Sequence, residues 1–251
     1  MNPTTGTTTT TTATTTAAPT LDHLVVVAHT LAEGEAWCLR TLGVAPGPGG
    51  EHPLMGTHNR LLSVASPQFP GAYLEIIAIN PVANYAGRTS GKRWFDMDCE
   101  PLMQSVQRNG PQLVHWVARV PDLDAARTAL TQLGLDAGPA VAASRATPEG
   151  LLQWRITIRP DGQRPMGGCL PTLIQWGGAH PTDRMPASGV RLQALALSHP
   201  QAPLLTQALN TLGLPPPADT SPLAATPAPH PGLRALLDTP CGSVELCMPI
   251  F

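Results

Sequence analysis

Two histidines occupy matching places in strand-like segments of the chain, His23 in LDHLVVVA and His115 in QLVHWVARV. A neutral imidazole is a common ligand of divalent metals, and it also gives or takes a proton near pH 7. Each segment precedes an amphipathic helical stretch that ends in Leu-Gly, and glycine commonly follows a helix end. The match therefore indicates equivalent positions in two copies of one unit. For either histidine alone, a packed and hydrogen-bonded core residue is the alternative.

Two oxygen-bearing side chains stand later in the same units, Glu75 in AYLEIIAI and Gln175 in LPTLIQW. If the units pack about a pseudo-two-fold axis, their first strands meet and these four side chains surround one point. Two imidazole nitrogens with two oxygens suit a divalent ion of intermediate hardness, such as Zn, Ni, Fe or Mn. We therefore predict a metal site formed by His23, Glu75, His115 and Gln175, with Glu75 as the catalytic residue that holds the metal or moves a proton.

The elements that would position these residues recur in the order strand, helix, further strands. The first pass has strands at 21–28, 58–65 and 72–79 and a helix at 31–42. The second has strands at 112–120, 151–158 and 170–176 and a helix at 122–134, and a third runs from 190 to 249. This pattern predicts an α+β fold of repeated βαβββ modules. The first two modules span 21–100 and 111–180 and pair into one cleft domain over 21–180, and the third module spans 189–251. The alternative is that the pattern reflects chance similarity among helices that end in Leu-Gly.

Strand alternation indicates which side chains face the cleft. It places His23 on one face with Leu21, Val25 and Val27, and Asp22 on the other. In the later strands the predicted substrate-binding residues are His58, Asn59, Arg60, Arg155 and Trp176. Alternation sends His58 and Arg60 to the face opposite Asn59. The RWFDMD segment between the modules either covers the cleft or is an ordinary linker.

Composition excludes several classes of protein. Hydrophobic residues make up 42% of the 251 residues and charged ones 13%, which allows a large core. The formal charge is −2 without a basic run, so we expect no nucleic-acid partner. The five cysteines are scattered and odd in number, which favours neither a disulfide framework nor a thiolate zinc site.

The two ends of the chain differ in character. Residues 1–20 are almost wholly Thr, Ala, Gly and Pro, and this composition predicts a disordered Thr-rich tail. The tail lacks the basic start and apolar stretch of a signal peptide, and no long apolar run follows. We therefore expect a cytoplasmic protein without a membrane partner. The third module has no internal mate, so it either packs on the first pair or forms a homodimer.

The runs LDHLVVVAHTLAEG, HPLMGTHNRLLSVA, AYLEIIAINP and RWFDMD together resemble glyoxalase-like proteins of the vicinal oxygen chelate superfamily, which includes glyoxalases, bleomycin-resistance proteins and extradiol dioxygenases. The resemblance covers residues 21–178. It implies two βαβββ modules around a U-shaped cleft, with metal ligands from their first and last strands at His23, Glu75, His115 and Gln175. Gln175 departs from the carboxylate of the metal-dependent members, and an amide cannot act as a base.

The resemblance implies two classes of function. The first is a divalent-metal-dependent lyase, isomerase or dioxygenase acting on a small oxygen-rich or carbonyl substrate. The second is a metal-free protein of the bleomycin-resistance type that binds and sequesters a small molecule, which the neutral Gln175 favours. A degenerate metal-free paralogue whose third module serves assembly is a further reading.

Overall fold

The computed structural model describes residues 18–83, 85, 91–147, 150–214 and 222–249, so most of the predicted tail lies outside the described residues. Eight strands form the larger sheet: β1 Thr20–Val27, β2 Glu51–His52, β3 Thr57–Ser63, β4 Tyr73–Ile79, β5 Gln112–Arg119, β6 Ala140–Thr147, β7 Gly150–Thr157 and β8 Thr172–Trp176. Four form the smaller sheet: β9 Arg191–His199, β10 Leu223–Pro227, β11 Gly232–Thr239 and β12 Gly242–Cys247. The α-helices are α1 Leu31–Leu42, α2 Glu100–Asn109, α3 Leu123–Gln132 and α4 Ala202–Thr211, and short 3₁₀ turns lie at Pro165–Gly168 and Pro181–Asp183.

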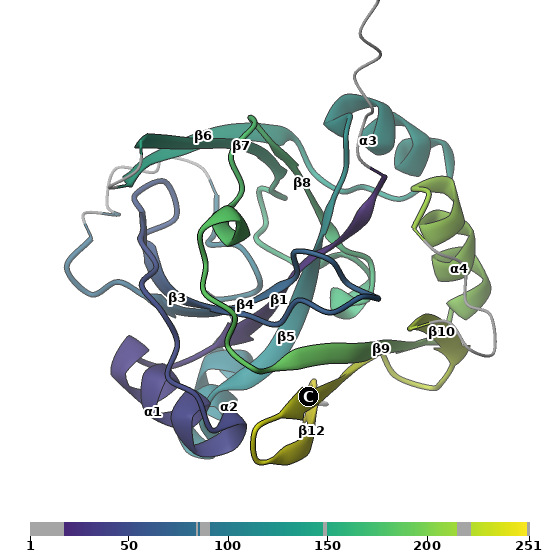
Figure 1. Ribbon diagram of the computed structural model, residues 1–251. Coiled ribbons are helices and arrows are strands. Elements are labelled where there is room, and N and C mark those ends of the chain that lie inside the picture. The colour runs from purple at the N-terminus through teal and green to yellow at the C-terminus, as the bar shows by residue number, and fades with distance from the viewer. Residues whose placement is uncertain (1–17, 84, 86–90, 148–149, 215–221, 250–251) are drawn as a thin grey trace, which may run out of the picture.

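The larger sheet joins two modules of the same topology. Its strand order is β2-β3-β4-β1-β5-β8-β7-β6, so each module places its strands in the same sequence outward from the centre. The first strands, β1 and β5, pair antiparallel at the joint, and each pairs in parallel with the last strand of its own module. Figure 1 shows these two strands crossing the middle of the molecule, with the other strands curving away on either side. The predicted α+β fold of paired βαβββ modules is confirmed.

Local sequence explains where the helices begin and end. The side chain of Thr30 accepts a hydrogen bond from the backbone N–H of Glu33 at the start of α1. At the other end Gly43 adopts φ 74°, a left-handed conformation that glycine takes without strain. The side chain of Asp122 caps α3 in the same way as Thr30 caps α1. The sequence patterns did not predict α2, which connects the two modules.

The third segment repeats the element order of the modules but pairs its strands differently. The strand order is β10-β9-β11-β12, so β9, the first strand of this segment along the chain, pairs with β10 and β11. In the two modules, by contrast, the first strand pairs with the last: β1 with β4, and β5 with β8. Its hydrophobic side chains, such as Leu195, Leu205 and Leu237, belong to the same core cluster as Leu24 and Trp116 of the central strands. The third segment therefore packs on the outer face of the first pair.

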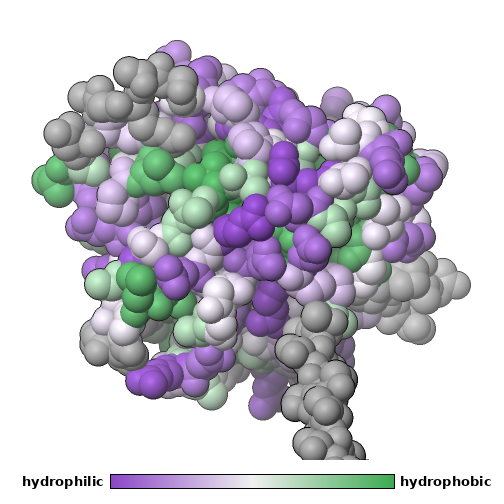
Figure 2. Space-filling model, turned by 90° about the horizontal axis from the view of Figure 1, so that it is seen from above, coloured by the Kyte–Doolittle hydropathy of each residue, from purple (hydrophilic) through white to green (hydrophobic). Residues whose placement is uncertain are grey.

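The two faces of the larger sheet serve different purposes. The outer face packs against α1, α3, α4 and the smaller sheet. The inner face is partly filled by the connection between the modules, which contributes Trp94, Phe95, Leu102 and Val106 to a second core cluster. Seen from above, the surface is mainly hydrophilic, with hydrophobic residues gathered at one side (Figure 2). In the described part of the chain no helix has the length and apolar character needed to cross a bilayer.

Candidate functional site

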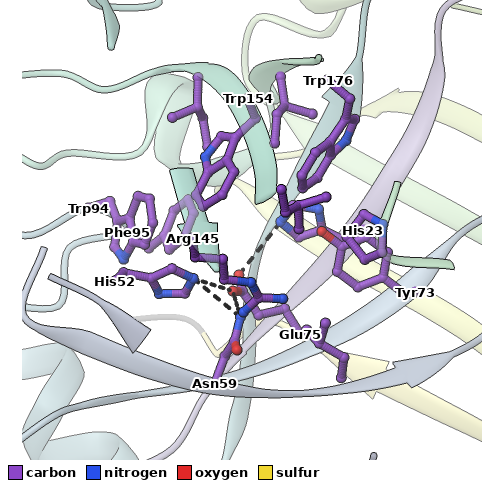
Figure 3. A pocket seen from close by; sticks show the side chains of 15 residues that line it. His23, His52, Asn59, Tyr73, Glu75, Trp94, Phe95, Arg145, Trp154 and Trp176 are labelled. Atoms are coloured by element: carbon purple, nitrogen blue, oxygen red, sulfur yellow. Dashed lines mark hydrogen bonds and ion pairs between the residues drawn. The ribbon is translucent and has the colours of Figure 1, made fainter. Parts of the chain in front are cut away.

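A small pocket lies on the inner face of the larger sheet, between the two modules. Its walls come from β1, β2, β3 and β4 on one side and from β6, β7 and β8 on the other, with Trp94 and Phe95 of the connection between them (Figure 3). Its volume is about 30 Å³, which is room for roughly two water molecules. The pocket thus encloses space for a small chemical group.

Glu75 on β4 is the carboxylate at the centre of the pocket. Its Oε1 accepts a hydrogen bond from Asn59 Nδ2 at 2.6 Å. His23 Nε2 lies 3.6 Å from Oε2, and His52 Nε2 lies 3.9 Å from Oε1. Figure 3 shows these side chains converging on Glu75 from β1, β2 and β3. A buried carboxylate is costly without partners, and here three polar side chains surround it.

Two glycines before β2 fix the orientation of Asn59. The backbone N–H of Gly50 donates to Asn59 Oδ1 at 2.8 Å, which leaves the amide nitrogen to donate to Glu75. A Cβ at Gly49 would lie 2.0 Å from the carbonyl oxygen of Asn59. The GPGG sequence is therefore what lets this loop approach β3 closely.

A β-bulge turns Asp22 toward His23. The pairing of β1 with β5 is regular except for shifts, one of which lies between Leu21 and His23. As a result Asp22 Oδ1 lies 2.7 Å from His23 Nδ1, and Leu21 packs in the outer core. The predicted alternation was wrong here, because an extra residue interrupts the strand, while His23 does share the inner face with Val25.

Asp22 is fully buried and receives three donors. Besides His23, Trp176 Nε1 donates to its Oδ2 at 2.9 Å, and His180 Nε2 lies 3.0 Å from the same oxygen. The backbone N–H of Thr182 donates to His180 Nδ1, so Nε2 carries the proton that faces Asp22. These contacts bind the loop after β8 to β1 and hold the His23 ring in place.

The charges of this cluster are coupled. Burial lowers the pKa of His23, but Asp22 and Glu75 outweigh it and raise this pKa to about 9. Burial raises the pKa of Glu75, but contact with His23 and the neighbouring His52 and Asn59 lower it to about 2. Burial also lowers the pKa of His52 to about 4. At neutral pH the pocket thus holds an imidazolium between two carboxylates, beside a neutral His52.

The segment that carries Trp94 and Phe95 forms a wedge in the cleft. The two rings stack on each other with centroids 5.2 Å apart, and Trp94 meets the ring of His52 edge-on. Phe95 and Asp96 both have φ 58°, which is strained for residues other than glycine. Asp96 is held by an ion pair with Arg164 at 2.7 Å. The hypothesis that RWFDMD covers the cleft agrees with this arrangement.

The structure brings together two of the four predicted metal ligands, His23 and Glu75. His115 is fully buried outside the pocket, with Nδ1 3.0 Å from the Gly168 carbonyl and Nε2 3.0 Å from the Thr172 hydroxyl. Gln175 points to the outer face, where its amide donates to the Pro121 carbonyl. Burial lowers the pKa of His115 to about 3, so it is neutral.

Of the five predicted substrate-binding residues, two lie in the pocket and three lie outside it. Asn59 and Trp176 line the pocket. Arg60 pairs with Glu35 of α1 on the outer face, and His58, which also alternates away from Asn59, lies outside the pocket. Arg155 forms an exposed ion pair with Asp124 of α3.

The residues present do not fit the divalent metal that the resemblance implies. Neither His115 nor Gln175 is directed toward Glu75, and the backbone N–H of Thr172 donates to His115 Nε2, the nitrogen that would have to bind the ion. Asn59 already occupies one oxygen of Glu75. Within the described ranges no three or more His, Cys, Asp or Glu side chains are arranged as a metal site.

Sequence reasoning missed several residues that line the pocket or lie behind its wall. Asp22 was hidden by the bulge, and His52 and His180 lie in loops or short elements that periodicity does not mark. Tyr73, whose ring stacks on His23 with centroids 4.6 Å apart, precedes Glu75 by two residues and shares its face, so alternation could have found it. Arg145 comes from β6, a strand that was not predicted.

Comparisons with known proteins agree with the fold. The family model described as "Glyoxalase-like domain" matches residues 21–213. A hypothetical protein from Staphylococcus aureus has a crystal structure with a TM-score of 0.53 at 13% identity, and the match covers 91% of this chain and 85% of that one. No curated protein matches the chain.

Methylmalonyl-CoA epimerases are also among the similar structures. The Streptomyces coelicolor enzyme in complex with 2-nitronate-propionyl-CoA gives a TM-score of 0.40 at 13% identity, over 65% of this chain and 99% of that chain. The Mycobacterium tuberculosis enzyme gives 0.36 at 18% identity, over 62% and 86%. At these values the likeness concerns the fold alone.

Proposed function

Because this chain belongs to the glyoxalase-like domain family, we propose that its pocket catalyses proton transfer on a small carbonyl substrate, as an isomerase or lyase. The observation that carries the proposal is the buried contact between Glu75 and His23 at the pocket wall. A carboxylate and an imidazolium held side by side are a general base and a general acid. The proposal keeps the predicted substrate class and replaces the four-ligand metal site with an acid–base pair.

The chemistry follows from the two charges. Glu75 takes a proton from the carbon next to the carbonyl, and the electron pair moves to the carbonyl oxygen, which forms an enolate. His23 gives its Nε2 proton to that oxygen. Once His23 is neutral, burial is offset less at Glu75, so its pKa rises and it holds the abstracted proton more firmly. With a 2-hydroxy carbonyl substrate, Glu75 gives the proton to the former carbonyl carbon while the other hydroxyl returns a proton to His23, and an isomer results. With a leaving group on the next carbon, the carbonyl re-forms and returns its proton to His23 while that group departs with its electron pair and the proton from Glu75, and a lyase product results.

Asp22 has a positioning role in this scheme. Its contact with Nδ1 directs the Nε2 proton of His23 toward Glu75 and the pocket, and its negative charge stabilises the imidazolium. Trp176 and His180 hold Asp22 from the other side. The acid of the pair is thus oriented by a rigid network rather than by one flexible contact.

Deuterium exchange tests the proposal without knowledge of the natural substrate. Small 2-oxo acids, 2-hydroxy ketones and aldehydes are incubated with the protein in D₂O, and loss of the C–H signal is followed by NMR. We expect exchange with at least one compound and a loss of roughly 10²- to 10⁴-fold in Glu75→Gln. Glu35→Gln, which alters a carboxylate on the outer face, is the matched control. Exchange at an unchanged rate in Glu75→Gln contradicts the proposal.

A binding protein is the second candidate function. The aromatic side chains around the pocket, among them Tyr73, Trp94, Trp154 and Trp176, favour it because aromatic walls bind small molecules without chemistry. The same NMR samples separate the two functions. A compound that binds in the pocket and never exchanges, in wild type as in Glu75→Gln, supports sequestration.

A further inference from the structure

Three donor atoms on two residues of the pocket wall have no hydrogen-bond partner in the described part of the chain. The Nε and Nη1 atoms of Arg145 are buried without a hydrogen-bond partner among the described residues, and so is Nε1 of Trp94. Both residues line the pocket that contains Glu75. A buried donor left unpaired costs about 1–3 kcal/mol, and a charged one costs more. Unpaired groups of this kind are rare in native proteins and call for a ligand, an ion or water.

The backbone makes room for the Arg145 side chain in this position. Arg145 starts on β6 of the second module and reaches across the cleft to the loop before β2 of the first. A Cβ at Gly50 would lie 2.2 Å from its Nη1, so the guanidinium rests directly on the backbone of that glycine. Figure 3 shows it beside His52, Asn59 and Glu75. The buried Nε and Nη1 edge of the guanidinium therefore lies in the wall of the pocket that holds the acid–base pair.

The other charges nearby are already matched. Asp22 has three donors, and Glu75 has Asn59 and His23. Arg145 is the cation of the pocket wall that these contacts do not satisfy. An anion with acceptor oxygens would satisfy both Arg145 and the Trp94 N–H. A carboxylate suits this subsite because its two coplanar oxygens match the planar guanidinium of Arg145.

We infer that Arg145 and Trp94 form a carboxylate-binding subsite, and that the substrate is a small carboxylic acid that also carries a carbonyl group. The second part of this inference rests on the proposed function, whereas carboxylate binding does not. The carboxylate binds at Arg145 and Trp94, which places the neighbouring carbon near Glu75. The subsite sets the charge of the substrate.

Binding of a carboxylate and of its neutral analogue tests the subsite. The probes are acetate, lactate and pyruvate, with pyruvamide as the uncharged match of pyruvate, and binding is followed by tryptophan fluorescence and ligand-observed NMR. We expect at least one carboxylate to bind at millimolar concentration, as suits a ligand of a few atoms. Loss of the guanidinium in Arg145→Gln should weaken this binding roughly 10- to 100-fold and leave pyruvamide unaffected.

Two further variants separate binding from folding. Trp94→Phe keeps an aromatic side chain and removes the N–H together with part of the indole, so carboxylate binding should weaken by a few-fold. The smaller ring lowers the melting temperature, so binding is measured well below it, on folded protein. Arg155→Gln removes an arginine outside the pocket and should change nothing. The inference is overturned if none of the three carboxylates binds at up to roughly 50 mM, if pyruvamide binds as well as pyruvate, or if folded Arg145→Gln binds carboxylates normally.

This experiment and the exchange experiment fail independently. Carboxylate binding lost in Arg145→Gln, without exchange in wild type, supports the subsite and contradicts the acid–base enzyme. Exchange with neutral carbonyl compounds alone, without carboxylate binding, supports the acid–base enzyme and contradicts the subsite.

Discussion

Thr172 occupies in the second module the place that Glu75 occupies in the first. Glu75 lies opposite Val25 in the parallel pair of β1 and β4, and Thr172 lies opposite Val117 in the parallel pair of β5 and β8. Each of these valines follows its strand histidine by two residues. The carboxylate of one half of the cleft therefore has a hydroxyl as its counterpart, and the chemistry of the cleft is one-sided.

Because the carboxylate lies in only one half of the cleft, substitutions in the two halves should affect exchange and carboxylate binding differently. Thr172→Val removes the hydroxyl that contacts His115 Nε2, so the free energy of unfolding should fall by about 1 kcal/mol. Exchange and carboxylate binding should remain at the wild-type level, because Thr172 lies outside the pocket of Glu75. Urea unfolding and the NMR assays measure the two effects. A Thr172→Val protein that loses exchange as Glu75→Gln does would show that both halves take part.

The hydrogen bonds of the predicted metal ligands also predict how much divalent metal the protein retains. We expect protein incubated with Zn, Ni, Fe or Mn and then dialysed to retain less than one equivalent of ion, because both ring nitrogens of His115 are engaged and Asn59 bonds to Glu75. Elemental analysis measures the content. One equivalent in wild type, lost in both His23→Ala and His115→Ala, would instead support the metal centre suggested by the resemblance.

The order of helices and strands could be predicted well because periodicity and turn residues mark it. The predicted helix 31–42 matches α1, which is capped by Thr30 at its start and by Gly43 at its end. The strand β6 was missed because AVAASRAT is rich in alanine and lacks a clear alternation of apolar residues. Because β6 was not predicted, Arg145, the cation of the pocket wall, was not predicted either.

The register of the second module could not be predicted from spacing. Gln175 was predicted as the counterpart of Glu75 from its place in the strand LPTLIQW and from the resemblance, yet the residue opposite Val117 is Thr172, three positions earlier. The hairpin of β6 and β7 makes this module longer than the first, and a change in loop length removes the link between residue count and register. The bulge at Asp22 is likewise a property of strand pairing, which one strand's sequence does not reveal.

The two adjacent glycines before β2 should differ in what they control. Gly49→Ala places a methyl group against the Asn59 backbone, which must shift, so we expect a stability loss of about 1–3 kcal/mol. Gly50→Ala meets mainly the Arg145 side chain, which can move, so stability should change little while carboxylate binding falls. Thermal melts and probe titrations measure both. Equal stability losses in the two variants would contradict the contrast.

The raised pKa of His23 predicts a pH dependence of stability. Because the pKa is about 9 in the folded state and 6.5 ordinarily, the stabilisation is complete below pH 6.5 and is lost as pH rises through 9. Its size is on the order of 3 kcal/mol. Urea unfolding across this range should show a fall in wild type that is reduced in His23→Gln and retained in the exposed control His29→Gln. Parallel pH curves for wild type and His23→Gln would count against the ion pair.

The charge state of His23 is the most direct test of the account. Nitrogen-detected NMR of ¹⁵N-histidine-labelled protein, assigned with His23→Gln, reports whether both ring nitrogens carry protons. The buried pair with Glu75 predicts an imidazolium at pH 7 that loses its proton near pH 9, and an earlier loss in Glu75→Gln. A neutral His23 ring at pH 7, with the same titration in Glu75→Gln, would contradict the acid–base pair.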